Sequence, residues 1–142
     1  MIKMTENEIM SIMVTSGTED KLMALGTITL GAVTMDMDVH IFLAFWGLEA
    51  FRKEAPLTNP TSMEGEPYDQ IMRKNMREKG LGNWRKNLET AKELGNVKII
   101  ACSNMLALLD IPEDDFIDLV DEVSGIATYI SATSDSSSNI FI

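Results

Sequence analysis

Short apolar runs that alternate with helix-forming segments are the feature that most constrains how this chain can fold. A strand buried on both faces of a parallel sheet is a short, continuous apolar run. Runs of this kind occupy residues 9–14, 39–45, 97–101, 116–120 and 139–142. The segments between them favour helices at residues 19–35, 48–53, 68–79, 84–94, 105–109 and 125–132. Because parallel strands are joined by crossover helices, this order predicts an α/β fold. We expect a three-layer α/β/α sandwich with flavodoxin-like layering and a mainly parallel sheet of about five strands.

The length and composition indicate one domain. The chain has 142 residues, of which 45% are apolar, and this suffices for a single buried core between layers. Three of the four prolines, Pro56, Pro60 and Pro67, fall in one stretch and predict a surface excursion at about residues 53–82. We therefore expect a single domain over residues 1–142, with a short basic amphipathic helix inside the excursion.

The charge of the chain is strongly acidic and unevenly distributed. The formal net charge is −10, but the stretch 52–98 holds ten basic and seven acidic residues and is net +3. A field of the overall sign repels phosphate backbones, and no basic patch with interleaved aromatic residues is present. Nucleic acid is therefore not expected as a partner, whereas a local basic face for a small anion is compatible with the sequence.

Cysteine usage and hydropathy indicate the compartment. A single cysteine cannot form an internal disulfide, and no basic-then-apolar leader opens the sequence. The longest uncharged stretches, 22–35 and 39–48, are too short to cross a bilayer. We expect a cytoplasmic protein without a membrane span.

The candidate site lies where the predicted strands end. In parallel sheets, the functional edge lies beyond the carboxyl ends of the strands, and four segments meet there: 16–18, 45–47, 102–104 and 124–125. Cys102 is the candidate reactive residue because it leaves a buried strand at the first turn of a helix, where free N–H groups and the helix dipole favour a thiolate. The candidate binding residues around it are Ser16, Gly17, Thr18, Trp46, Gly47, Ser103 and Asn104.

Other chemistries find little support in the sequence. The one histidine, His40, falls inside a predicted strand and is assigned a structural role, so a Cys–His hydrolase is not expected. One cysteine and one histidine do not supply a zinc or haem ligand set, and no metal or cofactor is expected. The eleven methionines are interpreted as packing residues. The acidic run 110–122 lacks the spacing of a calcium loop and is predicted to be a solvated face.

The run Ile100-Ala101-Cys102-Ser103-Asn104-Met105 resembles the cysteine motif of DsrE/DsrF-like proteins, particularly the subgroup often labelled peroxiredoxin-like. Residues 15–21, 42–48 and 125–129 are similar to three further stretches of that family. The resemblance implies a DsrE/F/H-like sandwich that forms homo-oligomers, commonly trimers or hexamers, and takes part in sulfur trafficking. It assigns a chemical role to Cys102 alone, which accepts sulfane sulfur and holds it as a persulfide, and gives Ser16, Gly17, Trp46, Gly47 and Ser103 a place around it.

Three functional hypotheses follow. In the first, the chain is a sulfur carrier or sulfurtransferase whose Cys102 takes sulfane sulfur from a donor and passes it to a partner thiol. Its partners are then donor and acceptor proteins, or small sulfane-sulfur anions such as thiosulfate or polysulfide. In the second, the chain is a non-catalytic oligomeric binding module in which Cys102 only packs. The third, a thiol peroxidase, requires an external thiol because the chain has no second cysteine.

Overall fold

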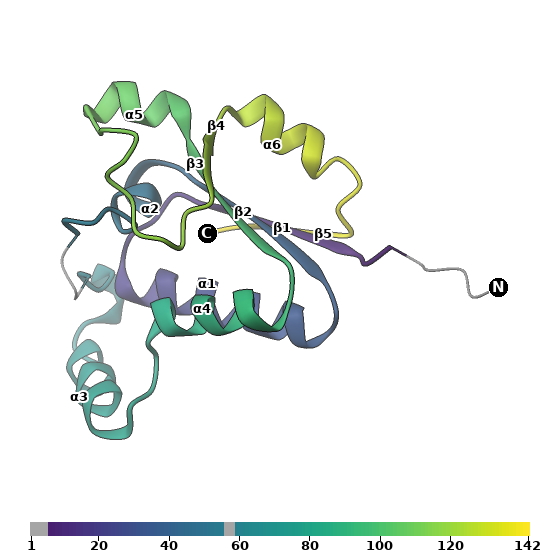
Figure 1. The fold of residues 1–142 in the computed structure, drawn as a ribbon. Coiled ribbons are helices and arrows are strands. Elements are labelled where there is room, and N and C mark those ends of the chain that lie inside the picture. Colours follow the sequence, from purple (N-terminus) through teal and green to yellow (C-terminus); the bar gives the residue numbers. More distant parts are fainter. Residues whose placement is uncertain (1–5, 56–58) are drawn as a thin grey trace.

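The computed structural model describes residues 6–55 and 59–142, and within them a parallel sheet forms the middle of the molecule (Figure 1). Its five strands lie in the order β4-β3-β2-β1-β5, and every neighbouring pair is parallel. The strands are β1 (Ile9–Val14), β2 (Asp38–Leu43), β3 (Val97–Cys102), β4 (Glu122–Ser124) and β5 (Ser138–Phe141). The predicted α/β class and the predicted mainly parallel sheet are confirmed.

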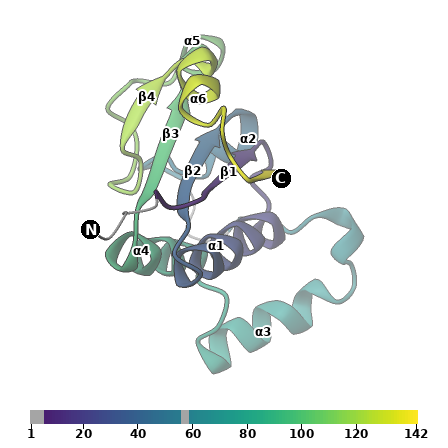
Figure 2. The ribbon, with the colours of Figure 1, turned by 90° about the vertical axis from the view of Figure 1, so that its right-hand side faces the viewer.

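Helices cover both faces of this sheet and complete the three layers (Figure 1 and Figure 2). The two longer helices beside the sheet, α1 (Glu19–Thr34) and α4 (Trp84–Leu94), lie against one face. The short helices α5 (Ser103–Leu109) and α6 (Ile126–Ala132) lie on the other side. The bounds of α4 equal those predicted, because Leu88, Ala91 and Leu94 set its period and Asn83 caps it by accepting a hydrogen bond from the Lys86 N–H at 3.1 Å.

The central strands place aliphatic side chains at matching positions on both sides of the sheet. Ile12, Ile41 and Ile99 are in register on β1, β2 and β3 and are fully buried. On the other face, the Phe42 ring of β2 stacks on Tyr129 of α6 with 4.8 Å between ring centroids. Because side chains alternate along a strand, Phe42 and its partner on β3, Ile100, mark the face that α6 covers.

The strand predicted at residues 116–120 is wrong. Phe116 makes an isolated antiparallel bridge with Arg52 instead, and the fourth strand is the three-residue β4. Asp121, just before β4, makes two hydrogen bonds with the backbone of Ile99 on β3. Its backbone N–H donates to the Ile99 carbonyl at 2.8 Å, and its carboxylate accepts the Ile99 N–H at 2.7 Å. Phe116 and Leu119 are buried as loop residues, so their apolar character reflects the core rather than a strand.

The segment after β2 also differs from the prediction. The strand ends at Leu43, and α2 (Phe45–Glu49) begins three residues before the helix expected at residue 48. Phe45 has a φ of 48°, in the left-handed region, so extended backbone cannot continue through it. The apolar run 39–45 therefore spans a strand and the start of a helix.

The described part of the Pro-bracketed excursion holds the short 3₁₀ helix η1 (Met63–Gly65) and α3 (Asp69–Lys79). Figure 1 shows α3 projecting away from the sheet, beyond α1 and α4. Gly80 ends α3 with a φ of 63°, a left-handed C-cap of the kind glycine favours. Within the described residues, no helix is long and apolar enough to span a membrane.

Acidic side chains at the start of α1 hold the excursion in place. The Asp20 carboxylate accepts hydrogen bonds from the Ser62 backbone N–H at 3.0 Å and from its hydroxyl at 2.7 Å. Glu19 accepts the Asn59 backbone N–H at 3.1 Å. Burial raises the pKa of Asp20, but the hydrogen bonds from Ser62 and Thr18 together outweigh burial and lower that pKa below its ordinary value.

Candidate functional site

The turns that follow β1 and β2 interlock at the carboxyl edge of the sheet. The backbone N–H groups of Trp46 and Gly47 both donate to the Thr15 carbonyl at 3.2 Å. A Cβ atom on Gly47 would lie 2.5 Å from the carbonyl oxygen of Val14. Glycine is therefore needed at position 47 for the close approach of α2 to the end of β1, and Gly47 is buried and does not line the pocket over these turns.

An open pocket of about 500 Å³ lies over these turns. Ser16, Gly17, Thr18 and Trp46 line it, and so do Glu49, Ala50, Arg52, Glu54, Ala55, Asn59 and Pro60. The Trp46 side chain is 60% exposed, which leaves its indole ring free to contact a ligand. Four of the predicted binding residues thus line one concave surface.

Cys102 belongs to the same edge of the sheet but not to this pocket. It is the last residue of β3 and the N-cap of α5, and its side chain is buried, with 6% exposed. In the register of the sheet, Cys102 of β3 pairs with Ser124 of β4. Because Ile100 and Cys102 are two residues apart on one strand, the thiol lies on the face that α6 covers.

The two residues after Cys102 are more accessible than the thiol itself. Ser103 and Asn104 form the first turn of α5, and both are exposed. A Cβ atom on Gly125, the residue just before α6, would lie 3.8 Å from the Ser103 hydroxyl oxygen. The structure therefore brings Ser103 and Gly125 close together, beside the strand end that carries Cys102.

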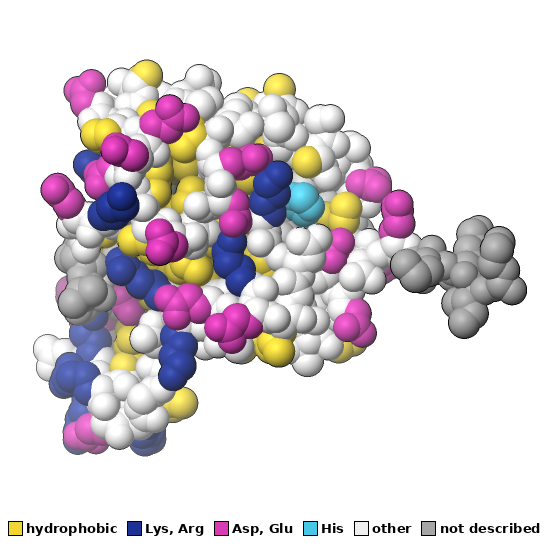
Figure 3. Space-filling view, in the orientation of Figure 1, with side chains coloured by type: hydrophobic (Ala, Val, Ile, Leu, Met, Phe, Trp, Pro, Cys, Tyr) yellow, Lys and Arg dark blue, Asp and Glu magenta, His cyan; other side chains and the backbone are white. Residues whose placement is uncertain are grey.

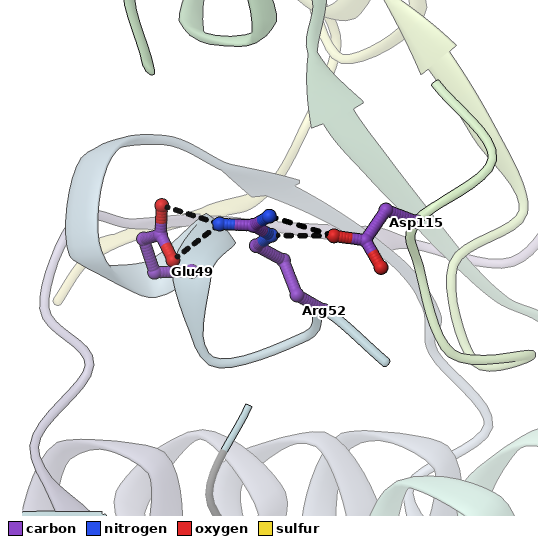
Figure 4. Close-up of polar contacts among 3 residues, drawn as sticks. All are labelled: Glu49, Arg52 and Asp115. Carbon is purple, nitrogen blue, oxygen red and sulfur yellow. Dashed lines mark hydrogen bonds and ion pairs between the residues drawn. The ribbon is translucent and has the colours of Figure 1, made fainter. Parts of the chain in front are cut away.

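A partly exposed ion network that includes Glu49 and Arg52 of the pocket lining is not predicted from the sequence (Figure 4). Arg52 donates through Nε to Asp115 at 2.8 Å and through Nη1 to both carboxylate oxygens of Glu49, at 3.2 and 3.3 Å. The hydrogen bond to Asp115 is the largest cause of the raised pKa of Arg52. Two carboxylates therefore neutralise this guanidinium, and it does not present a free positive charge to the pocket. The i,i+3 spacing of Glu49 and Arg52 is a sequence signal, but the partner 63 residues away is not.

His40 lies apart from the thiol. It is in register with Lys98, four residues before Cys102 on β3, which corresponds to roughly 13 Å along the strands. Burial, and then the nearby charge of Lys98, lower the pKa of His40. Its Nδ1 atom is buried and makes no hydrogen bond within residues 6–55 and 59–142. The imidazole is thus not placed to act as a base toward Cys102.

Groups suited to a metal ion are also lacking in the described part of the chain. No three His, Cys, Asp or Glu side chains there are close enough together to hold an ion. The acidic run predicted to be a solvated face is partly engaged in ion pairs instead. Asp115 pairs with Arg52, Asp121 with Lys92, and Glu122 with Lys98.

Comparison with known proteins places this fold and sequence in a family. The sequence profile of the DsrE/DsrF/DrsH-like family matches residues 6–68 and 56–141. The chain is 30% identical to the uncharacterized protein YrkE of Bacillus subtilis, over 93% of this chain and 95% of that protein. It is 26% identical to the sulfur carrier protein DsrE2 of Allochromatium vinosum, over 96% of this chain and 99% of that protein.

Two solved structures share the fold. The protein MTH1491 from Methanobacterium thermoautotrophicum superposes with a TM-score of 0.58 at 13% identity, and the ychN protein of E. coli with 0.58 at 15% identity. Each match covers 96% of this chain and all of the other. The profile covers all five strands of the described sheet, from β1 to β5 in chain order, and the chain therefore belongs to the DsrE/DsrF/DrsH-like family.

Proposed function

We propose that this protein is a sulfur carrier that holds sulfane sulfur as a persulfide on Cys102 and transfers it to the thiol of a partner. The observation that carries the proposal is the position of Cys102, the only thiol of the chain, at the carboxyl end of β3 and the start of α5. Family membership and the similarity to a protein named sulfur carrier DsrE2 support a role in sulfur trafficking.

The transfer consists of two displacements at sulfur. The Cys102 thiolate attacks the sulfane sulfur of the donor, the sulfur–sulfur bond of the donor breaks, and the donor leaves as a thiolate or as sulfite. The thiolate of the acceptor then attacks the outer sulfur of the Cys102 persulfide, and the Cys102 thiolate leaves. Each step forms one bond and breaks one, so no external oxidant or reductant is consumed.

The burial of Cys102 sets a condition on this chemistry. With 6% of its surface exposed, the thiol reacts only when its surroundings open. The elements next to the thiol are short: β4, at the edge of the sheet, has three residues, and α5 has seven. Short elements at an edge open at a lower free-energy cost than the central strands. Transient opening of this region, or contact with a partner protein, exposes the persulfide to exchange.

Association of copies is part of the proposal. Ile130, Phe141 and Leu108 are exposed large apolar side chains. Ile130 and Leu108 belong to α6 and α5, which lie on the side of the sheet that carries Cys102, and Phe141 of β5 is in register with Met13 and Phe42 on that face. Exposed apolar groups of this size favour a protein partner. We propose a cytoplasmic homo-oligomer, a trimer or hexamer, that exchanges sulfur with donor and acceptor proteins or with small sulfane-sulfur anions.

The test is intact-mass spectrometry of the reduced protein after incubation with polysulfide or thiosulfate, beside a Cys102→Ser control. We expect a gain of one or more sulfur atoms that dithiothreitol reverses and that the variant lacks. Native alkylation by iodoacetamide measures thiol accessibility in parallel. A protein that iodoacetamide alkylates but that takes up no sulfur contradicts the carrier proposal.

The burial of the thiol also favours a second candidate, a non-catalytic binding module that uses the Trp46 pocket. In that case the Cys102→Ser variant retains its assembly and its partners. A thiol peroxidase is distinguished by a faster reaction of Cys102 with hydrogen peroxide than with polysulfide, followed by turnover with an added thiol.

A further inference from the structure

A second pocket lies where the excursion meets the body of the molecule. Its volume is about 300 Å³, and it is bounded by α3 on one side and by the start of α4 on the other. The lining residues are Glu19, Arg73, Met76, Arg77, Leu81, Asn83, Trp84 and Arg85. Cys102 is not among them. The thiol lies on the α6 face of the sheet, whereas this pocket is lined by residues of α1, α3 and α4.

Three guanidinium groups converge on this pocket. Arg73 and Arg77 come from α3, and Arg85 comes from α4, against a single lining carboxylate, that of Glu19. The charged lining is therefore net +2 in a chain whose formal charge is −10. Figure 3 shows basic side chains gathered over α3 at the lower left of the molecule.

These arginines differ from Arg52 in what they bind. Within the described residues, none of the three forms an ion pair with a carboxylate. Arg73 donates through Nη2 to the Asn59 carbonyl at 2.6 Å and to the Thr61 hydroxyl at 2.9 Å, and both acceptors are uncharged. Within the described residues, the only side-chain hydrogen bond of Arg85 goes to the Ala50 carbonyl at 3.4 Å. After Glu19 is counted, the net charge of +2 in the pocket lining is thus left without a partner of opposite charge among the described residues.

The spacing of the arginines carries an energetic cost. Arg73 and Arg77 are four residues apart on α3, and like charges at this spacing destabilise a helix. Glu19, the one carboxylate of the pocket, accepts the Asn59 backbone N–H. A bound anion between Arg73, Arg77 and Arg85 removes the repulsion and supplies the missing acceptors.

The remaining lining is apolar. Met76 and Leu81 lie on the side of the excursion, and Trp84 forms part of the floor, where its ring contacts Phe51 at a centroid distance of 5.0 Å. The Arg85 guanidinium carbon lies 5.1 Å from the centroid of the Trp84 ring, which orients this cation. A ligand with an anionic group and a compact apolar part matches both kinds of lining.

We propose that this pocket binds a small oxyanion of sulfur or phosphorus, either as the free ion or as the terminal group of a compact organic molecule. The planar fork of an arginine donates paired hydrogen bonds to two oxygens of such a group, and several arginines can share its oxygens. The site is separate from Cys102 and does not depend on the chemistry of that thiol.

The experiment is titration of the protein with three probes: inorganic phosphate, thiosulfate and phenyl phosphate. The readout is isothermal titration calorimetry, together with the fluorescence of Trp84 in a Trp46→Phe background. The test variant is Arg77→Gln, because no hydrogen bond of Arg77 to the described residues is lost with it. The matched control is Lys79→Gln, which removes one charge from the same helix but outside the pocket.

We expect Arg77→Gln to weaken binding by about tenfold or more, because a charge-assisted hydrogen bond to the anion is lost. Lys79→Gln should change binding by less than about twofold. Arg85→Gln tests the same site from α4, and Cys102→Ser leaves the binding of phosphate and of phenyl phosphate unchanged. Tighter binding of phenyl phosphate identifies an organic ligand, and equal binding identifies the free ion. The proposal is overturned if no probe binds to the unmodified protein. Equal weakening by Arg77→Gln and Lys79→Gln overturns it as well, because only unspecific attraction then remains.

Discussion

A Cβ atom on Gly17 would lie 2.2 Å from the backbone carbonyl oxygen of Trp46. The turn after β1 and the first turn of α2 therefore leave no space for a side chain at position 17. The obstacle is a backbone carbonyl, which cannot rotate away as a side chain could. We predict that Gly17→Ala lowers the free energy of unfolding by about 1–3 kcal/mol, as overpacking does in a core. Urea denaturation measures this change.

Gly31 provides the control for that substitution. It lies within α1, and a Cβ atom there would have no neighbour within 4 Å. Gly31→Ala is expected to raise the free energy of unfolding by about 0.5–1 kcal/mol, because alanine has the higher helix propensity. If both substitutions shift stability in the same direction, close contact with Trp46 is not the cause of the Gly17 effect.

The Arg52 network joins the end of α2 to the loop before β4 (Figure 4). The Arg52 guanidinium is partly exposed, so solvent weakens its ion pairs. We therefore predict that Arg52→Gln lowers the free energy of unfolding by only about 1 kcal/mol. A double-mutant cycle with Asp115→Asn isolates the pairwise energy, and Lys53→Gln, an exposed neighbour, controls for loss of charge. Additive effects of Arg52→Gln and Asp115→Asn would show that the pair is not coupled.

Asp20 is predicted to hold the excursion against α1. Asp20→Asn weakens the two hydrogen bonds from Ser62, so trypsin should cleave α3 faster while β1 to β3 stay folded. Asp114→Asn, at an exposed position, is the control and should leave the cleavage rate unchanged. Limited proteolysis followed by mass spectrometry identifies the cut sites.

The same contact has a defined pH dependence. Because the folded-state pKa of Asp20 lies below 3.8, the carboxylate stabilises the fold at neutral pH. That stabilisation is lost as the pH falls below 3.8 and through the folded-state pKa. An excursion that is released at the same pH in the unmodified protein and in Asp20→Asn would exclude this carboxylate as its anchor.

His40 predicts a second pH effect, in a different range. Burial is the main cause of its lowered pKa, Lys98 of β3 adds to it, and Asp38 and Asp135 oppose it. The folded protein therefore binds its proton less readily than the unfolded chain does. Stability from His40 is complete above the ordinary pKa of 6.5 and declines as the pH falls from there through the folded-state value.

The measurement is the free energy of unfolding between pH 7 and pH 5 for the unmodified protein and for His40→Gln. We expect a smaller decline in the variant, since the amide does not titrate. Titration of the carboxylates is common to both proteins and cancels in the difference. Parallel curves would mean that His40 does not contribute to the decline.

Local patterns predicted most of the elements because the relevant forces act over a few residues. β1 and α4 have the predicted bounds, and Gly80 ends α3 as its conformational freedom suggests. β4 was missed because three half-buried residues, Glu122 to Ser124, give no periodic signal. Pairing with β3, which only the folded chain provides, makes that segment a strand.

The same reasoning applies to the candidate site. The rule that parallel strands present their carboxyl ends at one edge predicts that Ser16 and Trp46 lie close together, and both residues line the same pocket. It does not distinguish the two faces of the sheet, and therefore it did not show that Cys102 lies outside their pocket. Contacts between distant segments, such as Arg52 with Asp115, depend on loop paths that no local pattern encodes.

Because side chains alternate along β3, the register of this strand determines which face of the sheet the Cys102 thiol occupies. Ala101 and Cys102 are neighbours, yet Ala101 faces the layer of the longer helices α1 and α4, and Cys102 faces the layer of the shorter helices α5 and α6. Deleting any one residue from the middle of β3 leaves its composition nearly unchanged but inverts this assignment. The sulfur atom would then face the core beneath α1 and α4, and under the proposed function a change of one residue in length would prevent sulfur exchange.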